Sequence, residues 1–96
     1  MTNIDRKENE MNGTWTITDG EKEIGKMQYN WLNASKFNIF HTEVDKEYAG
    51  KGYGKELLET AVKYARDNQK KITATCTYAK KIFEKDASYN DVYETN

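Results

Sequence analysis

The spacing of the apolar residues changes from strand period to helical period near residue 54, and that change constrains the fold more than any other feature. From residue 14 to residue 44, large apolar residues recur at about every second position, which is the period of a β-strand. From residue 54 to residue 67, they fall at helical spacing on one stripe, with charged residues opposite. The sequence therefore predicts a block of strands followed by an amphipathic helix.

A hairpin opens the block of strands. Thr-Trp-Thr-Ile-Thr at residues 14–18 alternates apolar with hydroxyl side chains, and Asp19-Gly20 is a strong signal for a tight turn. The return strand is predicted over about residues 22–32. Its larger apolar face is formed by alternate residues: Gly25, Met27, Tyr29 and Trp31.

A third strand is predicted over residues 36–45, after a short polar turn. Simple alternation places His41 and Glu43 on the same face as Phe37 and Ile39. Because the middle of this segment is apolar on both faces, we expect it to lie in the interior of the sheet.

Beyond the helix, the chain returns to a short strand and then to a second helix. Residues 72–76 alternate, and residues 78–85 carry a second helical stripe. The predicted class is α+β (mixed α/β): an antiparallel strand meander, a strand–helix–strand crossover and a C-terminal helix. Because such crossovers are right-handed between parallel strands, the last strand should run parallel to the third.

The length of 96 residues suits one small domain with one core. Residues 1–12 are mostly charged and polar and offer little to bury, so we expect a loose N-terminal arm followed by a single domain over residues 13–96.

Charge and cysteine content exclude several functional classes. Lys and Arg number 15 against 16 Asp and Glu, so the chain has no general basic field to hold a nucleic acid backbone. No stretch approaches the roughly 20 apolar residues of a membrane span, and no signal peptide is evident. A single cysteine suits a reducing compartment. We therefore expect a cytoplasmic protein that binds neither nucleic acid nor membrane, and its oligomeric state stays open.

Three glycines stand at alternate positions directly before the main helix: Gly50, Gly52 and Gly54. Such a turn exposes successive backbone N–H groups, and the start of the helix adds a partial positive charge. Lys51 and Lys55 bring further charge to the rim, which suits a diphosphate. The alternative is a flexible loop, or glycines that only help the helix to start, since short glycine patterns are weak signals.

Neither of the common nucleotide motifs fits this turn. The Walker pattern fails because the interval from Gly50 to Gly54 is one residue short and Lys55 is followed by Glu56, which leaves no hydroxyl for magnesium. The dinucleotide pattern fails because the glycine spacing differs and the strand over residues 72–76 offers no acid for a ribose.

The turn resembles the pyrophosphate motif of the GNAT superfamily of N-acetyltransferases, Gln/Arg-x-x-Gly-x-Gly/Ala. The matching stretch is Ala49-Gly50-Lys51-Gly52-Tyr53-Gly54. Residues 41–54, the helix to Asp67, and Cys76-x-Tyr78 followed by Lys80-Lys81-x-Phe83 are similar to very short GNAT-like acetyl-CoA-binding proteins. This resemblance covers about residues 13–93 and implies a GNAT-like fold and acetyl-CoA as cosubstrate.

The resemblance also implies which residues contact the coenzyme. The main chain of Val44 would pair with the pantetheine arm. Lys80 and Lys81 fit a solvated helix face, or alternatively a contact with the ribose phosphate, for which Lys81 is the candidate. The remaining contacts would come from the turn and the second helix: Ala49, Gly50, Lys51, Gly52, Tyr53, Gly54, Lys55 and Tyr78. Ala49 departs from the motif, which has Gln or Arg at this position, so we expect weaker coenzyme binding because only the backbone donors remain.

Three residues are candidates for chemistry. From its pattern alone, Cys76 fits a small buried hydrophobe, whereas the resemblance implies that it accepts the acetyl group as a thiolate. His41, the single histidine, is the natural base near neutral pH, and Glu43 is the alternative base. Both also fit ordinary strand positions, and one histidine with one cysteine does not make a metal site. Tyr78 follows Cys76 too closely to be assigned the role of protonating the departing coenzyme.

The function predicted from these residues is acetyl-CoA binding, with transfer of the acetyl group to an unidentified amine or thiol acceptor, through Cys76 or directly. One alternative is a non-catalytic module that binds or senses acetyl-CoA. A second is a small interaction domain in which exposed Trp15, Trp31 and the C-terminal tyrosines form a partner surface.

Overall fold

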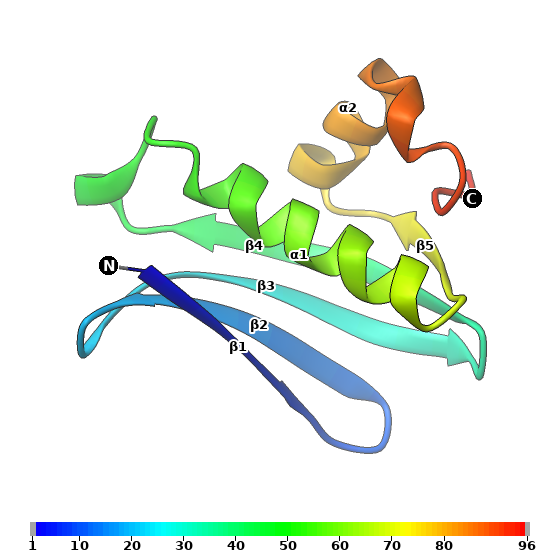
Figure 1. Cartoon of the computed structure of the whole chain (residues 1–96), viewed down its shortest axis with the longest axis horizontal. Helices are drawn as coiled ribbons and strands as arrows, with labels where there is room; N and C mark the ends of the chain where they lie inside the picture. The colour runs from blue at the N-terminus through cyan, green and yellow to red at the C-terminus, as the bar shows by residue number, and fades with distance from the viewer. Residues whose placement is uncertain (1, 96) are drawn as a thin grey trace.

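The structure is a computed structural model that describes residues 2–95, and within that range the chain forms five strands and two α-helices (Figure 1). The strands are β1 (Thr2–Glu8), β2 (Asn12–Asp19), β3 (Lys22–Asn33), β4 (Lys36–Val44) and β5 (Lys71–Ala74). The helices are α1 (Tyr53–Asp67) and α2 (Thr77–Lys85), and two short 3-10 helices lie at Lys46–Tyr48 and Ala87–Tyr89.

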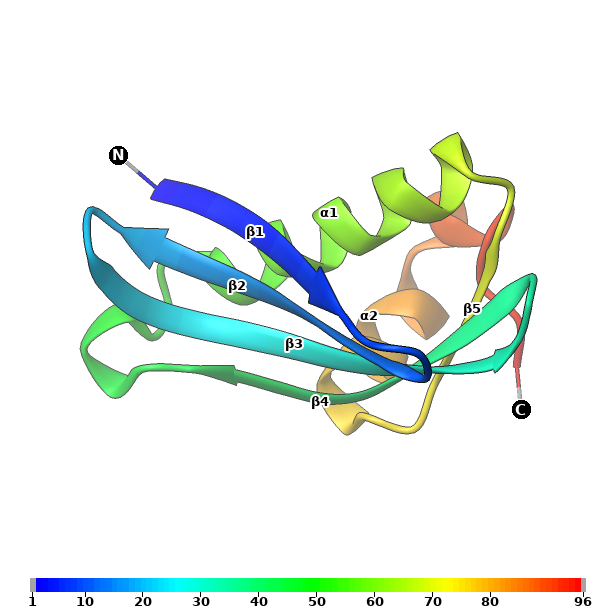
Figure 2. The ribbon, with the colours of Figure 1, turned by 90° about the horizontal axis from the view of Figure 1, so that it is seen from below.

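The strands form one sheet in the order β1-β2-β3-β4-β5. The first four are antiparallel, and β5 returns parallel to β4 after the α1 crossover. This confirms the predicted α+β arrangement of a meander, a crossover and a C-terminal helix. Figure 2 shows that α1 and α2 pack on the same side of the sheet and, in the part of the chain described, leave the other side of β2, β3 and β4 uncovered.

The core lies between α1 and the sheet. The predicted helical stripe is buried in full: Leu57, Leu58, Ala61, Val62 and Ala65. On the sheet side, the rings of Trp15, Tyr29 and Phe37 are buried and lie within 5.7 Å of one another, centroid to centroid. This aromatic cluster anchors β2, β3 and β4 beneath the helix and so fixes the strand that leads to the glycine turn.

A β-bulge in β4 changes the direction of its side chains. Tyr29 pairs with Ile39 and the preceding Gln28 pairs with His41, so Phe40 is an extra residue on β4. Because paired residues point to the same side of a sheet, side chains 41 and 43 lie on the uncovered face, opposite Ile39. The prediction that they share a face with the buried residues of this strand is therefore wrong, since the bulge shifts the alternation by one residue.

The N-terminal segment is also different from the prediction of a loose arm over residues 1–12. Thr2–Glu8 pairs with residues 13–19 of β2 as an edge strand, and Asn9 and Asn12 bond to each other across the connecting turn. Residue 1 lies outside the described residues. The high charge of this segment predicted a loose arm. In the structure, two of its charged side chains point toward the aromatic core and stabilise the strand.

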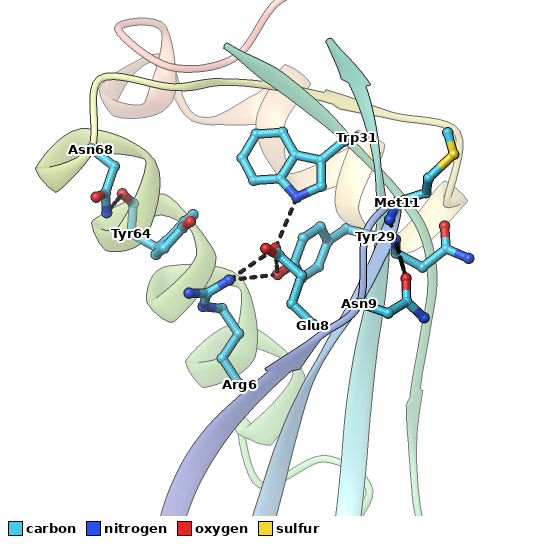
Figure 3. A network of polar contacts seen from close by, with 9 residues as sticks. Arg6, Glu8, Asn9, Met11, Tyr29, Trp31, Tyr64 and Asn68 are labelled. Atoms are coloured by element: carbon cyan, nitrogen blue, oxygen red, sulfur yellow. Dashed lines mark hydrogen bonds and ion pairs between the residues drawn. The ribbon is translucent and has the colours of Figure 1, made fainter. Parts of the chain in front are cut away.

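Figure 3 shows these two side chains, Arg6 and Glu8, in a polar network above the aromatic core. One oxygen of Glu8, Oε1, accepts hydrogen bonds from Arg6 Nη1 at 2.9 Å, from Tyr29 Oη at 2.7 Å and from Trp31 Nε1 at 2.8 Å. The guanidinium of Arg6 lies 4.4 Å from the centroid of the Tyr64 ring on α1. Partial burial acts to raise the pKa of the Glu8 carboxyl, but the hydrogen bonds from the tyrosine, the tryptophan and the arginine together lower that pKa below its usual value.

Replacing Glu8 with alanine should therefore lower the free energy of unfolding by about 2 kcal/mol, the loss expected when partners of a charged acceptor are left unpaired. Glu10→Ala is the matched control, because Glu10 is exposed just beyond the strand. Its effect should stay within about 0.5 kcal/mol. Urea unfolding followed by tryptophan fluorescence measures both variants, and equal losses would contradict the role given to Glu8.

The same comparison has an expected pH dependence. Because the folded-state pKa of Glu8 is lowered, its contribution is present above the unfolded pKa and is lost as the pH falls through the folded one. The difference in stability between the parent chain and Glu8→Ala should therefore shrink below about pH 4.5, the ordinary pKa of this carboxyl. Unfolding measured across acidic pH tests this, and a difference that grows on acidification would contradict it.

Candidate functional site

The glycine turn follows the 3-10 helix at Lys46–Tyr48 and leads directly into α1. Gly50 and Gly52 have φ values of 78° and 86°, in the left-handed region that side chains disfavour, and Gly52 is the N-cap of α1. A Cβ at either position would meet nothing within 4 Å, so backbone conformation, and not space, requires glycine here.

The start of α1 offers backbone donors to an anion. The first intrahelical bond runs from the amide of Glu56 to the carbonyl of Gly52, and no side chain caps the helix. The amides of the preceding residues in this first turn have no intrahelical acceptor. These donors, together with the helix dipole, can hold a phosphate group.

A cavity of about 340 Å³ opens beside the turn, between the end of β4, the start of α1 and the first turn of α2. Most of the residues predicted to contact the coenzyme line it: Val44, Ala49, Gly50, Gly52, Tyr53, Gly54 and Tyr78. Glu43, predicted as the alternative base, also lines it, and so do Thr42 and Tyr48, which the sequence reasoning missed. The alternation of residues in β4 could have predicted that Thr42 faces the cavity only if the position of the bulge had been known.

The three predicted lysines lie outside the lining of the cavity. Lys51 Nζ is 5.6 Å from the centroid of the Tyr48 ring, at the rim of the turn. Lys55, in the first turn of α1, is exposed. The pKa of the Asp86 carboxyl is lowered mainly by hydrogen bonds from Ser88 and in smaller part by the charge of Lys55. Lys81 is exposed on α2. Of the three, Lys51 is therefore the best placed to meet a group held by the turn.

The strands β4 and β5 divide next to this cavity. They pair from Lys36 to Ile39 of β4, and beyond that point the amides of Thr75 and Cys76 both donate to the carbonyl of Ile39, at 3.0 and 3.1 Å. Residues 40–44 of β4 continue with β3 on one edge and, within residues 2–95, with no strand on the other. This edge leaves backbone groups available to pair with an extended ligand.

Cys76 stands where the two strands divide and is the N-cap of α2. Its Sγ lies 3.4 Å from Oγ1 of Thr42, and the side chain is partly buried. Thr42 and Tyr78 both line the cavity, whereas Cys76 itself is not among the lining residues. The structure therefore places Cys76 next to the cavity, through its contact with Thr42.

Tyr78 closes the gap between the two helices. A Cβ at Gly54 would lie 2.6 Å from Tyr78 Oη, so only glycine at this position lets the tyrosine approach α1. Burial, and then the neighbouring Cys76, raise the pKa of the Tyr78 hydroxyl, which keeps it protonated at neutral pH.

His41 and Glu43 lie together but away from the cysteine. His41 Nε2 is 2.9 Å from Glu43 Oε1, which confirms the prediction that the two share a strand face. The hydrogen bond with His41, and then the charge of Lys26 at 3.7 Å, lower the pKa of the Glu43 carboxyl below its usual value. This pair is on the uncovered face of the sheet, whereas Thr42 points toward the helices with its partner Met27.

Two further observations concern residues 2–95. No group of three or more His, Cys, Asp or Glu side chains in this range could hold a metal ion. Neither of its two α-helices combines the length and the apolar character needed to cross a membrane.

Known proteins resemble this chain in sequence and in fold. Residues 14–92 match the family of GCN5-related N-acetyl-transferases. The solution NMR structure of a GCN5-like protein from Staphylococcus aureus is 38% identical, with a TM-score of 0.76 over 100% of this chain and 93% of that one. None of the curated proteins matches the chain.

More distant structures share the fold alone. The ribosomal-protein-alanine N-acetyltransferase from Brucella melitensis is 15% identical, with a TM-score of 0.68 over 81% of this chain and 64% of that one. The ribosomal-protein-S18-alanine N-acetyltransferase from Escherichia coli is 20% identical, with a TM-score of 0.58 over 64% of this chain and 39% of that one. This chain therefore spans less than two thirds of both enzymes.

The family match covers most of the chain, and the alignment with the Staphylococcus aureus protein covers 93% of that protein. The chain therefore belongs to the family of GCN5-related N-acetyltransferases.

Proposed function

We propose that this protein binds acetyl-CoA in the cavity beside the glycine turn and transfers the acetyl group to Cys76, from which it passes to a further acceptor. The observation that carries the proposal is the arrangement of one continuous site. Left-handed glycines and an uncapped helix start border a 340 Å³ cavity, and the thiol of Cys76 contacts Thr42, which also lines this cavity.

Each part of this site has a role in binding. The free amides at the start of α1 would hold the pyrophosphate, and Lys51 at the rim would add charge. The edge of β4 from Val44 toward Thr42 would pair with the amide groups of the pantetheine arm, because that edge has no neighbouring strand within residues 2–95. This path leads the thioester toward Cys76.

The chemistry is a thioester exchange. The Cys76 thiol first loses its proton to water, and the thiolate attacks the carbonyl carbon of the acetyl group. A new bond forms between that carbon and the cysteine sulfur, and the bond to the coenzyme sulfur breaks. Coenzyme A departs as a thiolate and takes up a proton, so the energy of the thioester is retained on the protein for transfer to an amine or a thiol.

Direct transfer to an amine is a second candidate, favoured by the pairing of His41 with Glu43. The two lie on the uncovered face of the segment of β4 that borders the divided strands. An amine approaching from this face would meet a histidine whose orientation is fixed by an ionised carboxylate. Binding without turnover is the third candidate, because Ala49 lacks the side chain that the family motif provides.

Intact mass spectrometry after incubation with acetyl-CoA tests the proposal. Transfer to Cys76 predicts a mass increase of one acetyl group that hydroxylamine removes, since a thioester is labile to that reagent. A bound coenzyme with no change in the mass of the chain would contradict the covalent step and leave direct transfer or simple binding. Absence of coenzyme binding would contradict all three candidates.

Restoring the family side chain should tighten coenzyme binding. Ala49→Arg adds a cation beside the turn, and an exposed charge pair of this kind is worth up to about 1 kcal/mol, or about fivefold in affinity. Ala49→Gln is the control, because it restores a donor without charge. Titration calorimetry at low and high salt should show a gain for arginine that fades with salt. A gain that does not depend on salt would contradict the electrostatic role.

A further inference from the structure

We propose that Thr42 is a positioning residue for Cys76: its hydroxyl donates a hydrogen bond to the thiolate and holds the sulfur next to the coenzyme cavity. This inference rests on the proposed role of Cys76 as the first acetyl acceptor. It assigns a function to a residue that the sequence pattern did not single out.

The β4 bulge is the reason that a threonine contacts the sulfur. With the extra residue at Phe40, Thr42 pairs with the buried Met27 and points toward the helices, while His41 points to the opposite face. Oγ1 of Thr42 then lies 3.4 Å from Sγ of Cys76. Without the bulge, the alternation would turn His41 to the helix side and Thr42 away from it.

The threonine is held more firmly than an exposed hydroxyl would be. A β-branched side chain on a strand has few rotamers, and Thr42 pairs with the buried Met27 and lines the cavity. The cysteine is fixed through its backbone, because its amide donates to Ile39 and its carbonyl accepts from the amide of Lys80. Both partners of the contact are therefore preorganised.

None of the ionisable groups described around the sulfur takes the positioning role, so we assign it to the neutral hydroxyl of Thr42. On α2, Tyr78 is close to Cys76 and its burial keeps it protonated, and Lys80 and Lys81 are exposed. On β4, the histidine and the glutamate pair with each other on the far face. A threonine hydroxyl cannot accept the thiol proton at neutral pH, so that proton leaves to water. What the hydroxyl can do is stabilise the negative sulfur by donating to it.

The test compares Thr42→Val, which keeps the shape and removes the hydroxyl, with Thr42→Ser, which keeps the hydroxyl. The readout is the rate of Cys76 alkylation by iodoacetamide across pH, since only the thiolate reacts. We expect alkylation at neutral pH to be about tenfold slower in the valine variant than in the parent chain, and to stay within about twofold of the parent rate in the serine variant. Acetyl uptake at neutral pH should then be about tenfold slower in the valine variant.

Circular dichroism checks that both variants are folded. If Thr42 had only a structural role, the pH profile of Cys76 alkylation would not change. Identical profiles for the parent chain and Thr42→Val would overturn the inference, whatever the acetyl uptake. A profile that moves as expected supports it. If the profile moves while the parent chain takes up no acetyl group, the contact is supported and it is the proposed transfer to Cys76 that fails.

Discussion

Replacing Cys76 with serine is expected to abolish the hydroxylamine-labile acetyl label altogether. Serine keeps a similar shape at the N-cap of α2, but its hydroxyl is a far weaker nucleophile than a thiolate at neutral pH. Because the sequence contains a single cysteine, no other residue can form the thioester. The hydroxylamine-labile acetyl label should therefore be lost completely, and not only reduced, in Cys76→Ser.

The control for this variant is coenzyme binding. The glycine turn lines the cavity and Cys76 does not, so the affinity of Cys76→Ser for coenzyme A should stay within about twofold of that of the parent chain, less than about 0.5 kcal/mol. A label that persists in the serine variant and resists hydroxylamine would lie on an amine. That result would sink the covalent mechanism and favour direct transfer beside His41 and Glu43.

Replacing Gly52 with valine should lower the affinity for coenzyme A at least tenfold, about 1.4 kcal/mol. At φ = 86° a side chain strains the backbone, and relief of that strain would turn the first amides of α1 away from the bound phosphate. Titration calorimetry with coenzyme A measures the loss. The reduction should be as large for coenzyme A as for acetyl-CoA, because the turn does not contact the acyl group.

Gly20→Val is the matched control for this substitution. Gly20 also has a positive φ, 63°, with nothing within 4 Å of its missing Cβ, but it lies in the β2–β3 turn, outside the coenzyme cavity. Both variants should lose similar stability, about 1–2 kcal/mol. Only Gly52→Val should lose affinity. Equal affinities in the two folded variants would remove the turn from the coenzyme site.

Strands β2 to β5, the main helix and the glycine turn could be predicted from the sequence, because each of them depends on the local spacing of residue types. The alternation around Trp15 and Ile17 and the stripe that contains Leu57 and Leu58 report burial directly, within a few residues. The turn was evident because glycine at alternate positions before a helix has few other uses. The class of fold and the phosphate end of the candidate site follow from these features.

The tertiary structure decided which side chain lies beside Cys76 and whether the N-terminal segment forms a strand. A bulge depends on the register against the neighbouring strand, so the periodicity of β4 alone could not reveal that Phe40 is an extra residue. Because of this extra residue, Thr42 lies beside Cys76 and His41 points to the opposite face of the sheet. In the same way, a charged segment pairs as β1 because Glu8 finds donors that lie more than twenty residues away along the chain, on β3. Such long-range contacts leave no local pattern, because they depend on which surfaces meet when the sheet and helix pack together.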